Sequence, residues 1–216
     1  DYVTSNEARN INIDGNNVSL DIVLGYPAKS VIATIRQQVI DKLKSIPGIG
    51  GVQVNITSKI VPHSVQRGVK LIPGVKNIIA VASGKGGVGK SATAVNLALA
   101  LVAEGARVGL LDADIYGPSQ PQMLGLTGRP ESPDGKSMLP MTAHGLQAMS
   151  IGFLIDVETP MVWRGPMVTQ ALQQLLTDTR WDDVDYLVVD MPPGTGDIQL
   201  TLAQKVPVTG AVIITT

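Results

Sequence analysis

Residues 84–91 read GKGGVGKS, which fits the pattern G-x-x-x-x-G-K-[ST] of a phosphate-binding loop, the P-loop. A short apolar run over residues 78–82 precedes the loop and is long enough for one buried strand. The run over residues 92–103 follows it and is rich in Ala and Leu, which predicts a buried helix. Strand, glycine loop and helix in this order place a helix N-terminus against the bound phosphates.

The residue types in this loop suit a nucleoside triphosphate bound together with Mg²⁺. Glycines let successive backbone N–H groups converge on phosphate oxygens. We expect Lys90 to place its charge at the β- and γ-phosphates and Ser91 to offer its hydroxyl to Mg²⁺. The alternative is a chance glycine turn, which the flanking strand and helix disfavour. The candidate nucleotide-binding residues are Gly84, Lys85, Gly86, Gly87, Val88, Gly89, Lys90 and Ser91.

The composition of the chain excludes several classes of function. Its 216 residues are 44% hydrophobic, which suits one or two globular domains. A net charge of −1 and 3% aromatic residues argue against nucleic acid or an anionic membrane as a partner. No apolar run approaches the roughly 20 residues that span a membrane. The chain lacks an initiator Met and stops inside the apolar run 211–214, so we expect it to be part of a longer protein.

The hydrophobic pattern divides the chain into three parts. Residues 1–58 predict a small α/β domain, with a hairpin over 11–24, a helix over 32–46 and a strand over 52–56. Residues 59–76 contain prolines and scattered positive charges, which indicates a solvated linker rather than a nucleic-acid-binding arm. From residue 77 to 216 strands and helices alternate, which predicts a P-loop NTPase domain of the α/β class with a mainly parallel sheet flanked by helices.

Carboxylates follow two of the predicted strands. The strand over 107–111 leads into Asp112 and Asp114, and the strand over 185–190 ends at Asp190 in a Walker B pattern. Ligands of such sheets bind at the carboxyl ends of strands, so we expect Ser91, Asp112 and Asp190 to hold Mg²⁺, Asp190 through water. A strand-end cap and turn is the alternative for the first two carboxylates.

Two loops follow these carboxylates. Residues 115–121 contain Gly and Pro and are expected to form a loop. After Asp190, Gly194 is a candidate to donate its backbone N–H to the γ-phosphate. A helix is expected to follow over residues 198–204. We therefore expect both segments to contact the nucleotide.

The second lysine of the loop, Lys85, is not required by an ordinary P-loop. With it, the loop resembles the deviant Walker A loop of the MinD, ParA and nitrogenase iron protein class. In that class this lysine reaches the nucleotide of the partner subunit in a dimer. The resemblance thus implies a homodimer in which Lys85, Lys90 and Asp114 are catalytic, with Asp114 orienting the attacking water. A solvated surface lysine is the alternative for Lys85.

Further motifs narrow the resemblance. Together with the loop, LLDADIYGPS, MVWRGP, LVVDMPPGTGDIQLTLAQ and VPVTGAVIITT make residues 77–216 resemble the Mrp/ApbC iron–sulfur cluster carrier ATPases, and residues 1–58 resemble the MIP18-type domain that precedes them. The family implies a cytoplasmic homodimer that uses ATP, Mg²⁺ and slow hydrolysis to pass a [4Fe–4S] cluster to apoproteins. Its Cys-x-x-Cys and its adenine contacts lie after the point where this chain ends. The chain has no cysteine, so we expect no iron–sulfur ligand within it.

Two alternative functions are also compatible with a P-loop of this type. A MinD- or ParA-type positioning or partition ATPase needs a membrane-binding tail or a basic DNA surface, and neither is visible in this sequence. A nucleotide-gated scaffold with negligible hydrolysis would need only the binding residues.

Overall fold

The computed structural model describes residues 1–63, 71–154, 165–194, 196, 199 and 206–215, without the side chains of 165–169. The described chain forms two compact units, the first mainly Asp1–Val61 and the second most of the chain from Pro62 onward. The helix predicted over 198–204 lies outside the described residues, except for residue 199. No helix in the described part of the chain has the length and apolar character needed to cross a bilayer.

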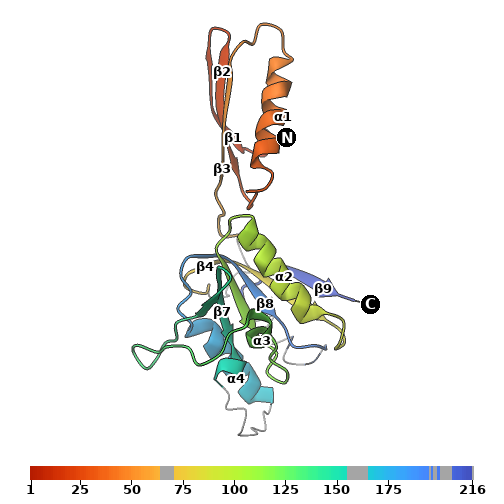
Figure 1. Ribbon diagram of the computed structural model, residues 1–216, viewed down its shortest axis with the longest axis vertical. Coiled ribbons are helices and arrows are strands. Elements are labelled where there is room, and N and C mark those ends of the chain that lie inside the picture. The colour runs from red at the N-terminus through yellow and green to blue at the C-terminus, as the bar shows by residue number, and fades with distance from the viewer. Residues whose placement is uncertain (64–70, 155–164, 195, 197–198, 200–205, 216) are drawn as a thin grey trace. The chain divides into compact units, whose positions relative to one another are not determined.

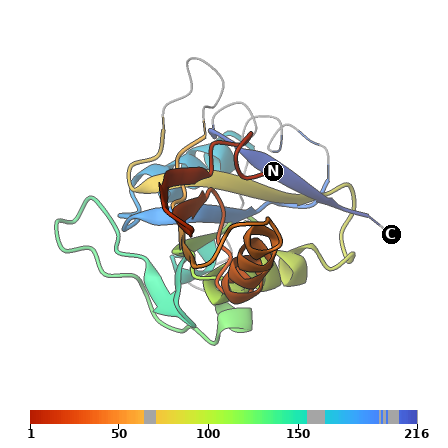
Figure 2. The same cartoon turned by 90° about the horizontal axis from the view of Figure 1, so that it is seen from above.

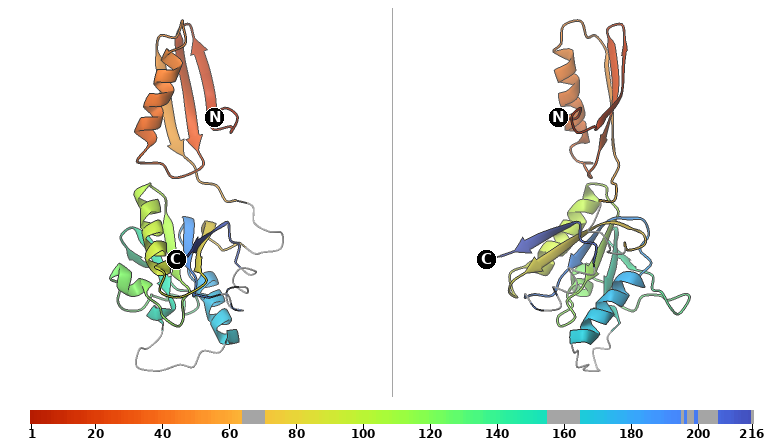
Figure 3. Two further views of the ribbon diagram at one scale, coloured as in Figure 1. Left: turned by 90° about the vertical axis from the view of Figure 1, so that its right-hand side faces the viewer. Right: turned by 180° about the vertical axis from the view of Figure 1, so that it is seen from behind.

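The first unit is a three-stranded sheet with one helix. Strands β1 (Ala8–Asp14) and β2 (Asn17–Leu24) form the predicted antiparallel hairpin, and β3 (Val52–Ser58) pairs parallel to β2. Helix α1 (Ile32–Lys44) makes the connection and lies along the sheet (Figure 3). Its Ile35 packs with Ile22, Leu24, Val54 and Ile56, which confirms the predicted alternation and helical spacing.

The second unit is built on a six-stranded sheet in the order β6-β7-β5-β8-β4-β9 (Figure 1). Its strands are β4 (Val75–Ser83), β5 (Val108–Asp112), β6 (Met141–Ala143), β7 (Leu146–Ser150), β8 (Val184–Asp190) and β9 (Gly210–Ile214). All neighbours pair in parallel except β6 and β7. The predicted mainly parallel sheet is therefore confirmed. Strand β4 starts at Val75, inside the stretch expected to be linker, because Val75 pairs with Val184.

Helices cover both faces of this sheet. Helix α2 (Lys90–Ala103) lies on one face and α4 (Gly165–Thr177) on the other (Figure 2). The inward residues of α4, among them Leu172 and Leu175, pack against Leu187 and Val189 of β8. A short 3₁₀ turn, η1 (Ile151–Phe153), follows β7. The central strands β5 and β8 are buried along almost their whole length, as expected for a parallel sheet covered on both faces.

A short helix begins in a segment where the sequence predicted only a loop. Residues 115–121 were expected to be a loop, but α3 (Gln120–Leu124) begins within them. Its second residue is proline, which the first turn of a helix accepts because the N–H there needs no helical partner. Gly125 ends the helix in the left-handed conformation, with φ of 67°. Helix α3 lies beside the start of α2, because the Gln120 side chain donates to the Ser91 carbonyl.

Candidate nucleotide site

The P-loop joins β4 to α2 and has the backbone that its glycines predict. Gly87 and Gly89 have φ of 76° and 85°, which side chains other than glycine adopt only with strain. Apart from the glycine itself and its chain neighbours, no described atom lies within 4 Å of the position that a Cβ would take at Gly84, Gly86, Gly87 or Gly89. These glycines are therefore not required by crowding in the structure, and we interpret them as serving close approach of a ligand to the loop backbone.

A cavity of about 270 Å³ lies over this loop. It is at the carboxyl ends of β4, β5 and β8, where ligands of parallel sheets bind. Whole-ligand pockets measure roughly 300–1,000 Å³, so this cavity suits the phosphates rather than a complete nucleotide. Its lining consists of Ser83, Lys85, Gly86, Gly87, Gly89, Lys90, Ser91, Ala92, Asp114, Ser119, Met123 and Pro193.

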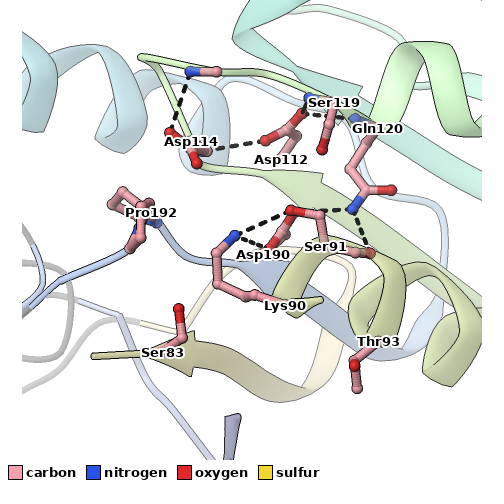
Figure 4. Close-up of polar contacts among 12 residues, drawn as sticks. Ser83, Lys90, Ser91, Thr93, Asp112, Asp114, Ser119, Gln120, Asp190 and Pro192 are labelled. Atoms are coloured by element: carbon pink, nitrogen blue, oxygen red, sulfur yellow. Dashed lines mark hydrogen bonds and ion pairs between the residues drawn. The ribbon is translucent and has the colours of Figure 1, made fainter. Parts of the chain in front are cut away.

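Lys90 and Asp190 form a buried ion pair at the base of the cavity (Figure 4). The Lys90 ammonium donates to Asp190 Oδ1 and lies 3.2 Å from the Ser91 hydroxyl. The two charged side chains are 7% and 0% exposed. The charge of the P-loop lysine is thus balanced by the Walker B carboxylate, which a bound phosphate would replace as the partner of Lys90.

Asp112 is fully buried and holds the loop that follows it. Its carboxylate accepts hydrogen bonds from the backbone N–H groups of Asp114 at 3.1 Å, Ser119 at 2.9 Å and Gln120 at 3.0 Å. The Ser150 hydroxyl donates to it at 3.2 Å. Burial raises the pKa of Asp112 to about 6, although these hydrogen bonds favour its ionised form. Here the side chain acts as the cap of the turn, and its place in the metal shell stays a prediction.

Asp114 is half-buried and its side chain lines the cavity. One of its oxygens accepts from the Gly117 N–H at 3.3 Å. Burial raises the pKa of Asp114, while the nearby Lys90 charge lowers it. Asp114 thus lies beside the cavity, and its expected role in orienting a water molecule stays a prediction.

Among the remaining candidates, Gly84 and Val88 are not among the residues that line the cavity, and Lys85 and Gly194 have contacts of their own. Lys85 is exposed at the edge of the cavity, and its carbonyl accepts from the Ser83 hydroxyl at 2.9 Å. Gly194 has φ of 105°, and its N–H donates to the Ser83 carbonyl at 2.9 Å. In this conformation the Gly194 N–H is engaged within the protein, so it would have to leave Ser83 before it could reach a phosphate.

Gln120 belongs to the site but was not identified from the sequence. Its side chain is 2% exposed, and its Nε2 donates to Asp190 Oδ2 at 2.9 Å and to the Ser91 carbonyl at 3.0 Å (Figure 4). It stands in a stretch expected to be loop, and no spacing rule marks a single glutamine. The hydroxyl of the neighbouring Ser119 is buried and has no partner among the described residues.

The side chains present fit a nucleotide-bound Mg²⁺. No group of three or more His, Asp or Glu residues within the described ranges forms a metal site by itself. Magnesium in such proteins is held by one or two carboxylates together with substrate phosphates. The Ser91 hydroxyl and the Asp190 carboxylate, both next to Lys90 Nζ, supply that limited set.

Comparisons with known proteins agree with the fold. Residues 74–216 match the model of the NUBPL iron-transfer P-loop NTPase family, and residues 1–56 match that of an iron–sulfur cluster assembly protein family. A solved nucleotide-binding protein from Archaeoglobus fulgidus, in complex with ADP and with cobalt found in it, is 38% identical. The match has a TM-score of 0.58 and covers 66% of this chain and 55% of that one.

Curated relatives carry the name iron–sulfur cluster carrier protein. Those from Pseudomonas fragi and Escherichia coli K12 are 61% and 55% identical over 81% and 91% of this chain. The one from Haemophilus influenzae is 50% identical over the whole chain. The chain spans 54–61% of the length of these relatives. The resemblance inferred from the motifs is confirmed, and the chain belongs to the NUBPL iron-transfer P-loop NTPase family.

Proposed function

We propose that this chain supplies the nucleotide-binding part of an ATP-dependent carrier that passes [4Fe–4S] clusters to apoproteins. One observation carries the nucleotide role: P-loop residues including Lys90 and Ser91 line one cavity at the carboxyl ends of the central strands, and the buried Asp190 pairs with Lys90. The carrier role is supported by the relatives named iron–sulfur cluster carrier proteins and by the iron-transfer family match.

The roles of the residues follow from their contacts. Lys90 exchanges Asp190 for the β- and γ-phosphates, and Ser91 and Asp190 are then free to hold Mg²⁺. When bound, Mg²⁺ neutralises charge that develops on the phosphate oxygens. Asp114, beside the same cavity, orients the water that attacks the γ-phosphate. These assignments make the protein a slow Mg-ATPase.

The homodimer is the second part of the proposal. Lys85 is exposed at the edge of the cavity, where a lysine can extend to a nucleotide in a second subunit. Gly194 would leave the Ser83 carbonyl and donate to the γ-phosphate, so that the segment after Asp190 moves with the nucleotide state. Such movement at a dimer face would link ATP to retention of the cluster.

The cluster itself is cargo and is held outside these residues. Iron–sulfur clusters are held chiefly by cysteine thiolates, and this chain has none among its 216 residues. The family's Cys-x-x-Cys, two cysteines from each subunit, would supply the ligands. Residues 1–58 and the P-loop NTPase domain that includes β4 from Val75 would act as separate domains, and the cytoplasmic location stays a prediction.

The proposal is tested by cluster transfer from the full-length protein. The protein is reconstituted anaerobically with iron and sulfide and mixed with an apo [4Fe–4S] enzyme, whose recovered activity reports transfer. We expect one cluster per dimer and a transfer rate that depends on Mg-ATP. Residues 1–216 alone should bind no stoichiometric cluster. A full-length protein that binds no cluster, or a cluster on residues 1–216, would contradict the proposal.

A further inference from the structure

We propose that Gln120 is a positioning residue of the Mg-nucleotide site, which fixes the Asp190 carboxylate relative to Ser91. The inference rests on the proposed function, because Ser91 and Asp190 are the groups expected to share Mg²⁺. Gln120 is 2% exposed at the start of α3, and its Nε2 donates to both Asp190 Oδ2 and the Ser91 carbonyl. Since both partners are acceptors, the orientation of the amide is determined by its contacts.

Gln120 connects three elements of the site. Its side chain joins the end of β8 to the first turn of α2, and its backbone N–H donates to Asp112 at the end of β5 at 3.0 Å. Figure 4 shows the side chain reaching from α3 towards Ser91 and Asp190. Gln120 therefore links Asp190 to α3 and to the loop that Asp112 holds.

Gln120 is expected to matter most once nucleotide binds. In the structure, Asp190 Oδ1 accepts from Lys90 and Oδ2 accepts from Gln120. Once Lys90 contacts the phosphates instead, the Gln120 amide is the side-chain contact that remains, among the described residues, to orient the Asp190 carboxylate. Without it the buried carboxylate would be free to rotate while the metal shell forms, which weakens binding of the metal.

The chemistry of the side chain also argues for a role beyond packing. Oε1 of Gln120 is buried and has no hydrogen-bond partner among the described residues. An unpaired buried acceptor costs free energy that an apolar side chain of the same size would avoid. The amide supplies a donor without charge, whereas a lysine would compete with Lys90 for Asp190 and a glutamate would repel it.

The test compares Gln120→Met with Gln122→Met, which changes an exposed glutamine of the same helix. Calorimetry measures the affinity of the full-length protein for ATP with Mg²⁺ and in EDTA. Loss of one hydrogen bond to a carboxylate should weaken Mg-ATP binding by about ten- to a hundredfold in Gln120→Met. Affinity in EDTA should stay within about twofold, since the lost contact acts on the metal ligand. Gln122→Met should match the wild type in both conditions.

Other results of this comparison would contradict either the inference about Gln120 or the proposed function. If Mg²⁺ raises the ATP affinity of Gln120→Met as much as that of the wild type, Gln120 is a packing residue and the inference is wrong. The same holds if the variant loses ATP affinity equally with and without Mg²⁺. If Gln120→Met does not fold, Gln120→Asn, whose shorter amide cannot span both acceptors, must show the same selective loss. A wild-type protein that fails to bind Mg-ATP would overturn the proposed function, and the inference with it.

Discussion

The ion pair between Lys90 and Asp190 makes a prediction that separates nucleotide binding from metal binding. Asp190→Asn removes one charge from a site where both side chains are almost completely buried. Without Mg²⁺, the native carboxylate competes with ATP for Lys90 and also repels the phosphates. The variant should therefore bind ATP more tightly than the wild type in EDTA and more weakly in Mg²⁺, where the carboxylate is needed.

The size of both effects follows from the contact that is removed. A hydrogen bond to a charged group contributes about 1.5–3 kcal/mol, and 1.4 kcal/mol changes affinity tenfold. We take the lower end of this range and expect a gain in ATP affinity of about tenfold in EDTA. Removing one partner of a buried ion pair costs about 3–5 kcal/mol, so the nucleotide-free variant should lose stability of that order.

The assay is ATP titration by calorimetry in EDTA and in Mg²⁺, together with urea unfolding of the nucleotide-free protein. Asp183→Asn is the matched control, because Asp183 pairs with Lys76 and Arg107 just before β8 but is 54% exposed. That variant should change stability by less than about 1 kcal/mol and leave ATP affinity unaltered. An Asp190→Asn protein with unchanged or weaker ATP affinity in EDTA would show that the carboxylate does not compete for Lys90.

Three further predictions concern hydrolysis and pH. Asp114→Asn should keep Mg-ATP binding but release phosphate about a hundredfold more slowly or worse, because it loses the group that orients the water; a parental rate would remove that role. Lys85→Ala should lower phosphate release while leaving the unfolding transition unchanged, since the side chain is exposed; unchanged turnover would make it a surface lysine. Burial raises the pKa of Asp112 from 3.8 to about 6, so its contribution to the free energy of unfolding is complete below about pH 4 and is lost as pH rises through about 6. Compared with Asp112→Asn in Mg²⁺-free urea titrations, the wild type should lose about 2.5 kcal/mol more between pH 4 and 7, and parallel curves would contradict this.

The sequence was sufficient to predict those elements whose conformation is determined by one local pattern. The apolar run before the P-loop, the glycines at fixed spacing and the buried strand that ends at Asp190 each specify their own conformation. The strand and helix alternation likewise predicted a mainly parallel sheet. These features depend on hydrophobic burial and backbone sterics, which act over a few neighbouring residues.

The features that escaped prediction depend on contacts between distant segments. Gln120 meets Asp190 across 70 positions of the chain, and the sequence holds no sign of that contact. Helix α3 is only five residues long, too short for a helical period to show. The Gly194 N–H is bound to the Ser83 carbonyl, a pairing that only the assembled sheet creates. Sequence patterns identify the residue types of this site, but tertiary packing determines which of these residues are in contact.

The most direct test of the nucleotide site is the affinity for Mg-ATP of the full-length protein and of its Lys90→Ala variant. Lys136→Ala, at an exposed lysine of the same unit, serves as the control. We predict that the wild type and Lys136→Ala bind Mg-ATP alike, and that Lys90→Ala folds but shows no measurable binding. Near-normal affinity in a folded Lys90→Ala protein would contradict the assignment of this cavity as the nucleotide site.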